Sequence, residues 1–398
     1  MVAQAKISNP MDARTVIAAA LVVSALGALF YNVLPIYVGA AQDYKGLDNR
    51  AVGFLTTAYF IGFNVVTISA FFWIRQVSWT FVVAIAAPIA ALSMSASALV
   101  EGYVPLLLLT AIAGGGFAAL YGVGTTILAD VSNPASWFGV KIAVEALPGV
   151  LLLLVLPGTA IAKWGFAGAV FGIVVLLIFL SPFLFWIPAR GRSAAPAQIA
   201  TGHTGSRQSP WIWASLAAIT LFFGGASAVW AFLERIAAAG GFSADAVGVL
   251  LSVTLVFAVL GSLLSAALAG RFGNVWPFAA SALLFAMSLL LLNEPATFAH
   301  YVIGACGATF TFAFMIPNSV TEVAELDTDG RFVILTVPAI GLGAMFGPAI
   351  GGTLSQSGEF GGLLIFGAVA MLLASILLVA GARNTRRQTD PHDLLETN

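Results

Sequence analysis

Residues 140–149 read VKIAVEALPG and place two charged side chains, Lys141 and Glu145, inside an apolar stretch. Residues four apart on a helix lie on the same face, so the ammonium and the carboxylate can form an ion pair. The pKa of a carboxyl group in an apolar setting depends on whether its surroundings are dry, wet or paired with a cation. Glu145 could therefore take up a proton under one condition and release it under another.

Three interpretations of the pair are open. Glu145 can exchange protons, Lys141 can neutralise it permanently as a structural ion pair, or Lys141 can extend to an aqueous surface and leave Glu145 protonated. The order lysine then glutamate is the weaker one for a helix, because it sets the cation toward the positive N-terminal end of the helix dipole. Helix stability alone does not explain the pair.

The rest of the chain is strongly apolar, since 60% of its 398 residues are hydrophobic, 8% are charged and the mean hydropathy is +1.01. A soluble domain carries about a quarter of its residues as charged ones, so most of this surface must face lipid. Continuous apolar runs of about 20 residues indicate transmembrane helices, not β-barrel strands. The sequence predicts twelve such spans, near 15–40, 51–74, 77–100, 103–128, 137–162, 164–187, 211–233, 245–269, 275–292, 296–321, 332–356 and 360–382.

The fifth predicted span contains the charged pair. It begins near Trp137, which puts Glu145 about 12 Å deeper, close to the middle of the bilayer. A charge at that depth is costly in lipid, so this helix face must look into the protein or into a water-filled cavity. We favour proton exchange among the three interpretations, because ionisable groups inside membrane spans usually have a function.

The basic residues predict the orientation. Most of the 16 Lys and Arg fall on one side of the membrane: Lys6, Arg14, Arg75, Arg190, Arg192, Arg207, Arg271, Arg331, Arg383, Arg386 and Arg387. Only Lys45, Arg50, Lys163 and Arg235 fall on the other. The positive-inside rule then puts both termini in the cytoplasm of a multi-pass protein of the plasma membrane, here the bacterial inner membrane. The first span has no cleavage site after it and is expected to be retained.

A polar segment, 188–210, separates six spans from six. The predicted organisation is a six-helix bundle over 1–188, a cytoplasmic linker over 189–210 and a second six-helix bundle over 211–398. AVGFL at 51–55 matches AVGVL at 246–250, an offset of 195, and Phe117-Ala118 and Phe171-Gly172 recur at the same offset. These matches indicate an internal duplication. The charged pair is not duplicated, because Thr336 and Ile340 stand at the corresponding positions.

With twelve helices in two halves, the chain resembles the major facilitator superfamily of secondary transporters. GAMFGPAIGG at 343–352 reproduces the family motif G-x-x-x-G-P-x-x-G-G, and GRFG at 270–273 resembles part of its loop motif. The resemblance implies an all-α membrane protein with two pseudo-symmetric bundles and alternating access. It also implies a central substrate cavity lined by helices 1, 4, 7 and 10, which here carry Tyr31, Asn32, Tyr121, Trp230 and Asn318.

Two ion pairs are expected to form a cytoplasmic gate. Asp130 and Glu325 end the fourth and tenth spans and are 195 apart, and each should approach the loop arginine of its own half, Arg75 or Arg271. Asp43, Glu234 and Arg235, at the opposite membrane surface, are expected to be rim charges.

The glycines of GAMFGPAIGG share one helix face. Gly343, Gly347 and Gly351 let a neighbouring backbone come close, and Pro348 removes one helical hydrogen bond. We expect either a hinge or a tightly packed contact here.

These features predict a secondary active transporter for a small amphipathic or aromatic organic solute, coupled to protons through Glu145 and Lys141. Open alternatives are a proton-driven efflux antiporter and, from another class, a non-transporting assembly or sensor protein on the same fold. There is no P-loop motif, and no enzyme activity, cofactor, metal site or nucleic-acid partner is expected. The expected partners are a small-molecule substrate, protons and the lipid bilayer, and the expected state is a monomer.

Overall fold

The computed structural model describes residues 9–191, 209–268, 271, 275–293, 297–327 and 332–389. These residues form thirteen α-helices and four short 3-10 or π turns, and no strand occurs among them. The helices are α1 (Arg14–Asn32), α2 (Leu34–Lys45), α3 (Asn49–Trp73), α4 (Trp79–Leu99), α5 (Tyr103–Ala129), α6 (Pro134–Val155), α7 (Ala162–Leu180), α8 (Trp211–Ala239), α9 (Ala244–Leu268), α10 (Val275–Leu292), α11 (Phe298–Leu326), α12 (Thr336–Leu354) and α13 (Gly361–Thr389).

The all-helical fold and the twelve predicted spans are confirmed. The described residues contain eleven stretches long and apolar enough to cross a membrane, and one of them, Ser136–Trp186, is 51 residues long and holds two spans. Within it, α6 passes through a π-helical turn, Pro157–Ile161, into α7. The chain reverses at Gly165, whose φ of 58° favours glycine. The protein is therefore a multi-pass membrane protein.

The first span is broken into α1 and α2 at Val33. Pro35 has no N–H, so the carbonyl of Tyr31, four residues earlier, loses its helical donor. The indole Nε1 of Trp230 on α8 donates to that carbonyl at 2.8 Å. The break therefore supplies a backbone acceptor for a helix 199 positions further along the chain.

The helices form two groups, which we call the first half (α1–α7) and the second half (α8–α13). In the first half α5 packs against α1, α3 and α4, and in the second α11 packs against α8, α9 and α10. The corresponding helices α3 and α9 have 25 residues each and begin at residues 49 and 244, which are 195 apart. The offset of the sequence repeat thus recurs in the helix positions. Most of the expected linker lies outside the described residues.

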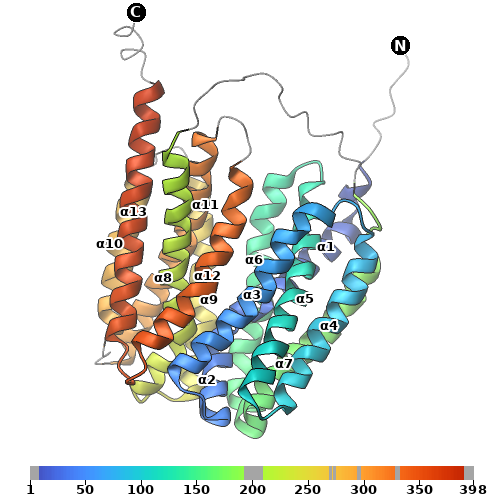
Figure 1. Ribbon diagram of the computed structural model, residues 1–398, viewed down its shortest axis with the longest axis vertical. Coiled ribbons are helices and arrows are strands. Elements are labelled where there is room, and N and C mark those ends of the chain that lie inside the picture. The colour runs from blue at the N-terminus through green and yellow to red at the C-terminus, as the bar shows by residue number, and fades with distance from the viewer. Residues whose placement is uncertain are drawn as a thin grey trace, which may run out of the picture.

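The two halves meet mainly near one end of the molecule. Helix α1 begins and α13 ends at one end, which we call the linker end, and α2 lies at the other, which we call the sealed end (Figure 1). The contacts between halves join α2 to α8, α3 to α12 and α6 to α9. Hydrogen bonds cross from Asn49 to the carbonyl of Ser355 at 2.5 Å, and from Thr57 to that of Met345 at 2.7 Å. Asn64 donates to the carbonyl of Gly341 at 2.8 Å, deeper toward the linker end.

The glycines of α12 lie in a close helix contact. A Cβ at Gly347 would overlap the carbonyl oxygen of Gly224 on α8, and a Cβ at Gly343 would lie 2.6 Å from the Cβ of Phe223. Where α12 contacts α3 of the first half, a Cβ at Gly53 would overlap the carbonyl oxygen of Pro348. The motif therefore packs α12 against both α8 and the other half.

Gly347→Ala is expected to destabilise the protein by about 1–3 kcal/mol, because backbone must move to admit the methyl group. Gly139→Ala on α6 is the matched control, since a Cβ there would meet nothing within 4 Å. The control should be neutral or slightly stabilising, because alanine is the better helix former by about 1 kcal/mol. Thermal unfolding of both variants in detergent measures the difference, and equal midpoints would contradict the packing argument.

Candidate functional site

The two charges of α6 form an ion pair inside the first half. Lys141 Nζ lies 2.7 Å from Glu145 Oε1, and the lysine side chain is 5% exposed against 14% for the glutamate. Lys141 does not extend to an aqueous surface in this structure, which removes the interpretation that it leaves Glu145 alone. Proton exchange and a permanent ion pair both remain compatible with this geometry.

A tyrosine from α5 completes the surroundings of the ammonium. Lys141 Nζ donates to the hydroxyl of Tyr121 at 3.0 Å and lies 4.2 Å from the centre of its ring. The buried cation thus has a carboxylate, a hydroxyl and the face of an aromatic ring around it. These contacts compensate for the loss of water around the charge.

Helix α1 holds the carboxylate from the other side. Ser24, which is fully buried, donates its hydroxyl proton to Glu145 Oε1 in a short hydrogen bond. Asn32 donates to the backbone carbonyl of Glu145 at 2.7 Å. Asn32 is the last residue of α1 before its break, so the position of α6 is tied to the broken span.

The ion pair lies one helical turn from a contact between α6 and α9. Nearer the sealed end, Ser252 of α9 donates to the carbonyl of Val150 at 3.1 Å. One turn from Glu145, a Cβ at Gly149 would lie 3.0 Å from Leu255 of α9. The chain places Lys141 beyond that point, toward the linker end. Glu145 therefore lies one turn from the contact between the two halves, which we call the α6–α9 junction.

A series of aromatic rings in the first half leads to Tyr121, the partner of Lys141. Tyr31, Phe60, Phe63 and Tyr121 follow one another with ring centres 5.9, 6.3 and 6.0 Å apart. The hydroxyl of Tyr31 is buried and has no hydrogen-bond partner among the described residues. A polar atom of a bound molecule could therefore pair with it.

The other predicted cavity residues are divided between the halves. Trp230 lies in the contact with Tyr31 described above and is buried. Asn318 is on α11 of the second half, where it donates to Ser265 of α9 at 2.8 Å and to the carbonyl of Phe314 at 2.7 Å. The structure thus brings Asn32 and Tyr121 into contact with the ion pair and joins Trp230 to Tyr31, but gives Asn318 partners within its own half.

Only the first of the two expected gate ion pairs forms among the described residues. Arg75 binds both carboxylate oxygens of Asp130, at 2.6 and 2.9 Å, at the linker end. No ion pair joins Arg271 to Glu325, although both residues are described. The first pair connects the end of α5 to the α3–α4 turn of the same half, so it does not by itself hold the two halves together.

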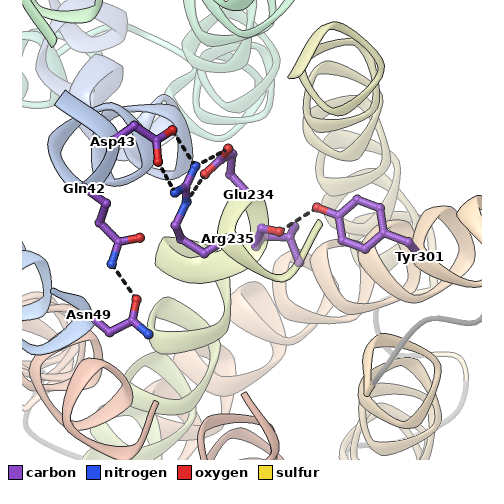
Figure 2. A network of polar contacts seen from close by, with 7 residues as sticks. Gln42, Asp43, Asn49, Glu234, Arg235 and Tyr301 are labelled. Carbon is purple, nitrogen blue, oxygen red and sulfur yellow. Dashed lines mark hydrogen bonds and ion pairs between the residues drawn. The ribbon is translucent and has the colours of Figure 1, made fainter. Parts of the chain in front are cut away.

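The three charges expected at the rim of the opposite end make direct contact with one another. Asp43 of α2, and Glu234 and Arg235 of α8, form a cluster that joins the two halves (Figure 2), which we call the sealed-end triad. A Cβ at Gly39, one turn before Asp43, would overlap the carboxylate of Glu234. This close approach of α2 and α8 brings the opposite charges together.

Two features of the site were missed in the sequence. Ser24 is a lone serine in an apolar span, and nothing in its neighbourhood indicates a contact with residue 145. The triad did have a signal, because opposite charges stand near the corresponding ends of the first and seventh spans. Duplicated halves bring such ends together around a pseudo-two-fold axis. Among the described residues no cluster of His, Cys, Asp and Glu could hold a metal ion.

Of the comparisons with known proteins, the one with solved structures finds similar chains. No family model and no curated protein matches the sequence. Among solved structures, a D-xylose-proton symporter has a TM-score of 0.77 and 14% identity, covering 94% of this chain and 98% of that one. A bacterial homologue of the human lysosomal transporter Spinster, in an inward-facing conformation, has a TM-score of 0.71 and 17% identity, over 96% and 100%. A mutant of the nucleoside transporter NupG has a TM-score of 0.69 and 14% identity, over 94% and 100%.

All three are transporters, and each is matched over nearly its whole length. The chain therefore has the fold of the major facilitator superfamily of secondary transporters.

Proposed function

We propose that the protein is a secondary active transporter that moves a small organic solute by alternating access and couples this movement to protons through Glu145. The position of the ion pair carries this proposal. Lys141 is buried and Glu145 largely so, one turn from the α6–α9 contact between the halves. A rearrangement of the halves would change the water access of this carboxylate, so it could be reached by protons from one side at a time.

The membrane orientation follows from the basic residues. The linker end carries Arg14, Arg75, Arg190, Arg271 and Arg383, so we assign it to the cytoplasm under the positive-inside rule. The structure then represents a conformation closed toward the outside. The conformation closed toward the cytoplasm would require the sealed end to separate.

We infer the solute class from aromatic rings in both halves. The aromatic rings of Tyr31, Phe60, Phe63 and Tyr121 stand on the first half, and Phe223 and Phe312 of the second half lie 4.9 Å apart. Aromatic faces stack on flat apolar molecules, and the few polar groups fix their orientation. We propose an aromatic or amphipathic solute with a small number of hydrogen-bonding groups.

The experiment uses proteoliposomes that contain a pH-sensitive dye and an imposed proton gradient. The probes are a purine nucleoside, which is aromatic, and D-xylose, which has similar hydroxyl groups but no aromatic ring. We expect nucleoside uptake accompanied by proton movement, and little uptake of D-xylose. Equal or better transport of D-xylose would contradict the aromatic solute class, and accumulation without proton movement would contradict the coupling.

The direction of transport is tested in the same vesicles by reversing the proton gradient. A symporter takes up solute with the protons, whereas the alternative, an efflux antiporter, moves it against them. We propose symport, because the D-xylose-proton symporter has a TM-score of 0.77 to this chain. Uptake that occurs only when protons leave the vesicle would favour the antiporter.

A further inference from the structure

We propose that the sealed-end triad is a charge lock in which Arg235 releases Asp43 and keeps Glu234 when this end opens during transport. In the present conformation Arg235 binds both Glu234 and Asp43 of the other half, and in the conformation open at this end it keeps only Glu234. The lock rests on the alternating access proposed above, but it concerns the balance between the two conformations and needs no statement about the solute.

The contacts of the guanidinium group carry the argument. Arg235 Nη1 and Nη2 bind the two carboxylate oxygens of Asp43 at 2.6 and 3.0 Å. The same group donates from Nε and Nη2 to the two oxygens of Glu234 at 2.5 and 2.7 Å. One cation is therefore shared between two carboxylates, each bound through both of its oxygens (Figure 2).

The two carboxylates differ in their attachment. Glu234 is the neighbour of Arg235 on α8 and moves with it, whereas Asp43 is on α2 of the first half. They also differ in exposure: the side chain of Asp43 is 54% exposed and that of Glu234 is 14% exposed. Separating the halves therefore removes the exposed partner and leaves the buried one in place.

This arrangement lowers the cost of opening. Leaving a buried charge without a partner is strongly destabilising, and a lone Arg235 would oppose the separation of the halves. With Glu234 in place, Arg235 stays neutralised, and Asp43 is already accessible enough to be hydrated. The two carboxylates also repel each other while the end is closed, because the triad carries one negative charge in excess.

Hydrogen bonds between uncharged groups also hold the two halves together near the sealed end. The indole of Trp230 donates to the carbonyl of Tyr31, and Asn49 donates to that of Ser355. Gln42, next to Asp43, donates to the side chain of Asn49 (Figure 2). The halves can thus remain together without the ion pair, so weakening it should shift the conformational balance and leave the protein folded.

Neutralising the two carboxylates should have opposite effects. Asp43→Asn removes the bond between the halves, so the sealed end should open more often. Glu234→Gln removes both the repulsion and the alternative partner, so the sealed end should open less often. A role in folding alone would move both variants in the same direction.

The test measures distances between spin labels in detergent, without solute or gradient. Cys306→Ala, which removes the single native cysteine, gives the background. One pair of labels at exposed positions 101 and 239 spans the sealed end, and another at exposed positions 76 and 267 spans the linker end. We expect Asp43→Asn to raise the ratio of separated to closed sealed ends by roughly threefold to tenfold, as for a partly exposed bidentate charge pair. Glu234→Gln should lower that ratio, and Asp43→Glu should restore it toward that of the wild type.

Asp245→Asn is the matched control. Asp245 is an exposed aspartate at the same end, in the first turn of α9, and takes part in none of the four ion pairs of the described residues. Its ratio should equal that of the wild type. Asp43→Lys, which faces a second cation toward Arg235, should open the end further even if the wild type is almost entirely closed.

The proposal is overturned if Asp43→Asn and Asp43→Lys both leave the sealed-end distances unchanged. It is also overturned if Asp43→Asn and Glu234→Gln shift the ratio in the same direction. Because these distances are measured without transport, a failure of the lock is distinguishable from a failure of proton coupling at Glu145.

Discussion

Replacing Glu145 by glutamine is expected to abolish accumulation of solute driven by a proton gradient, while exchange of solute across the membrane persists. Glutamine has the shape of the protonated acid, so it can occupy the same place beside Ser24 and Lys141. It cannot release a proton, so the two conformations no longer differ in protonation. The measurement compares gradient-driven uptake with counterflow of labelled solute in the same proteoliposomes.

Glu101→Gln is the control for this experiment, because Glu101 is exposed in the turn between α4 and α5. This variant should accumulate solute like the wild type. If Glu145→Gln still accumulates solute against its gradient, Glu145 is not the proton-coupling residue. The ion pair would then be a permanent structural one, the remaining alternative for this geometry.

Replacing Lys141 by methionine is expected to destabilise the protein by about 3 kcal/mol, since it leaves a buried carboxylate without its cation. Methionine keeps most of the length of the lysine side chain, so the loss of charge dominates over the loss of packing. The double variant Lys141→Met with Glu145→Gln should recover much of that stability, because neither charge remains. Thermal unfolding of both variants in detergent measures the effect.

Lys163→Met provides the control for the lysine. Lys163 is exposed, at the sealed end, and lies 5.0 Å from the ring of Trp164. Its replacement should change the free energy of unfolding by less than about 0.5 kcal/mol. A double variant no more stable than Lys141→Met alone would contradict the coupling of the two charges that the 2.7 Å contact indicates.

The two results together distinguish the interpretations of the pair. A permanent ion pair predicts that the double variant, once stable, accumulates solute normally. Proton exchange at Glu145 predicts that the double variant folds but does not accumulate solute. Gradient-driven uptake by the double variant is therefore the measurement that best separates a permanent ion pair from proton exchange.

Most of the fold could be predicted from the sequence. Each membrane span must satisfy its own backbone hydrogen bonds in lipid, so length and apolar composition identify it without knowledge of its neighbours. The offset of 195 between AVGFL and AVGVL also anticipated the correspondence of α3 and α9, because duplicated helices keep their spacing along the chain. The contact of Lys141 with Glu145 was predictable for the same local reason, since the helix sets the spacing of residues four apart.

Contacts between distant residues depended on the tertiary structure. Ser24 binds the carboxylate of a residue 121 positions away, and Asp43 binds an arginine 192 positions away. Neither pairing follows from the periodicity of its own helix, because the angle and register between packed helices select the partner. The close approach of α2 to α8, which Gly39 permits, turned three expected rim charges into a cluster between the halves. The sequence by itself determined the membrane helices and their order, because these depend on local composition, whereas only helix packing decided which end of the molecule is closed and which polar groups meet there.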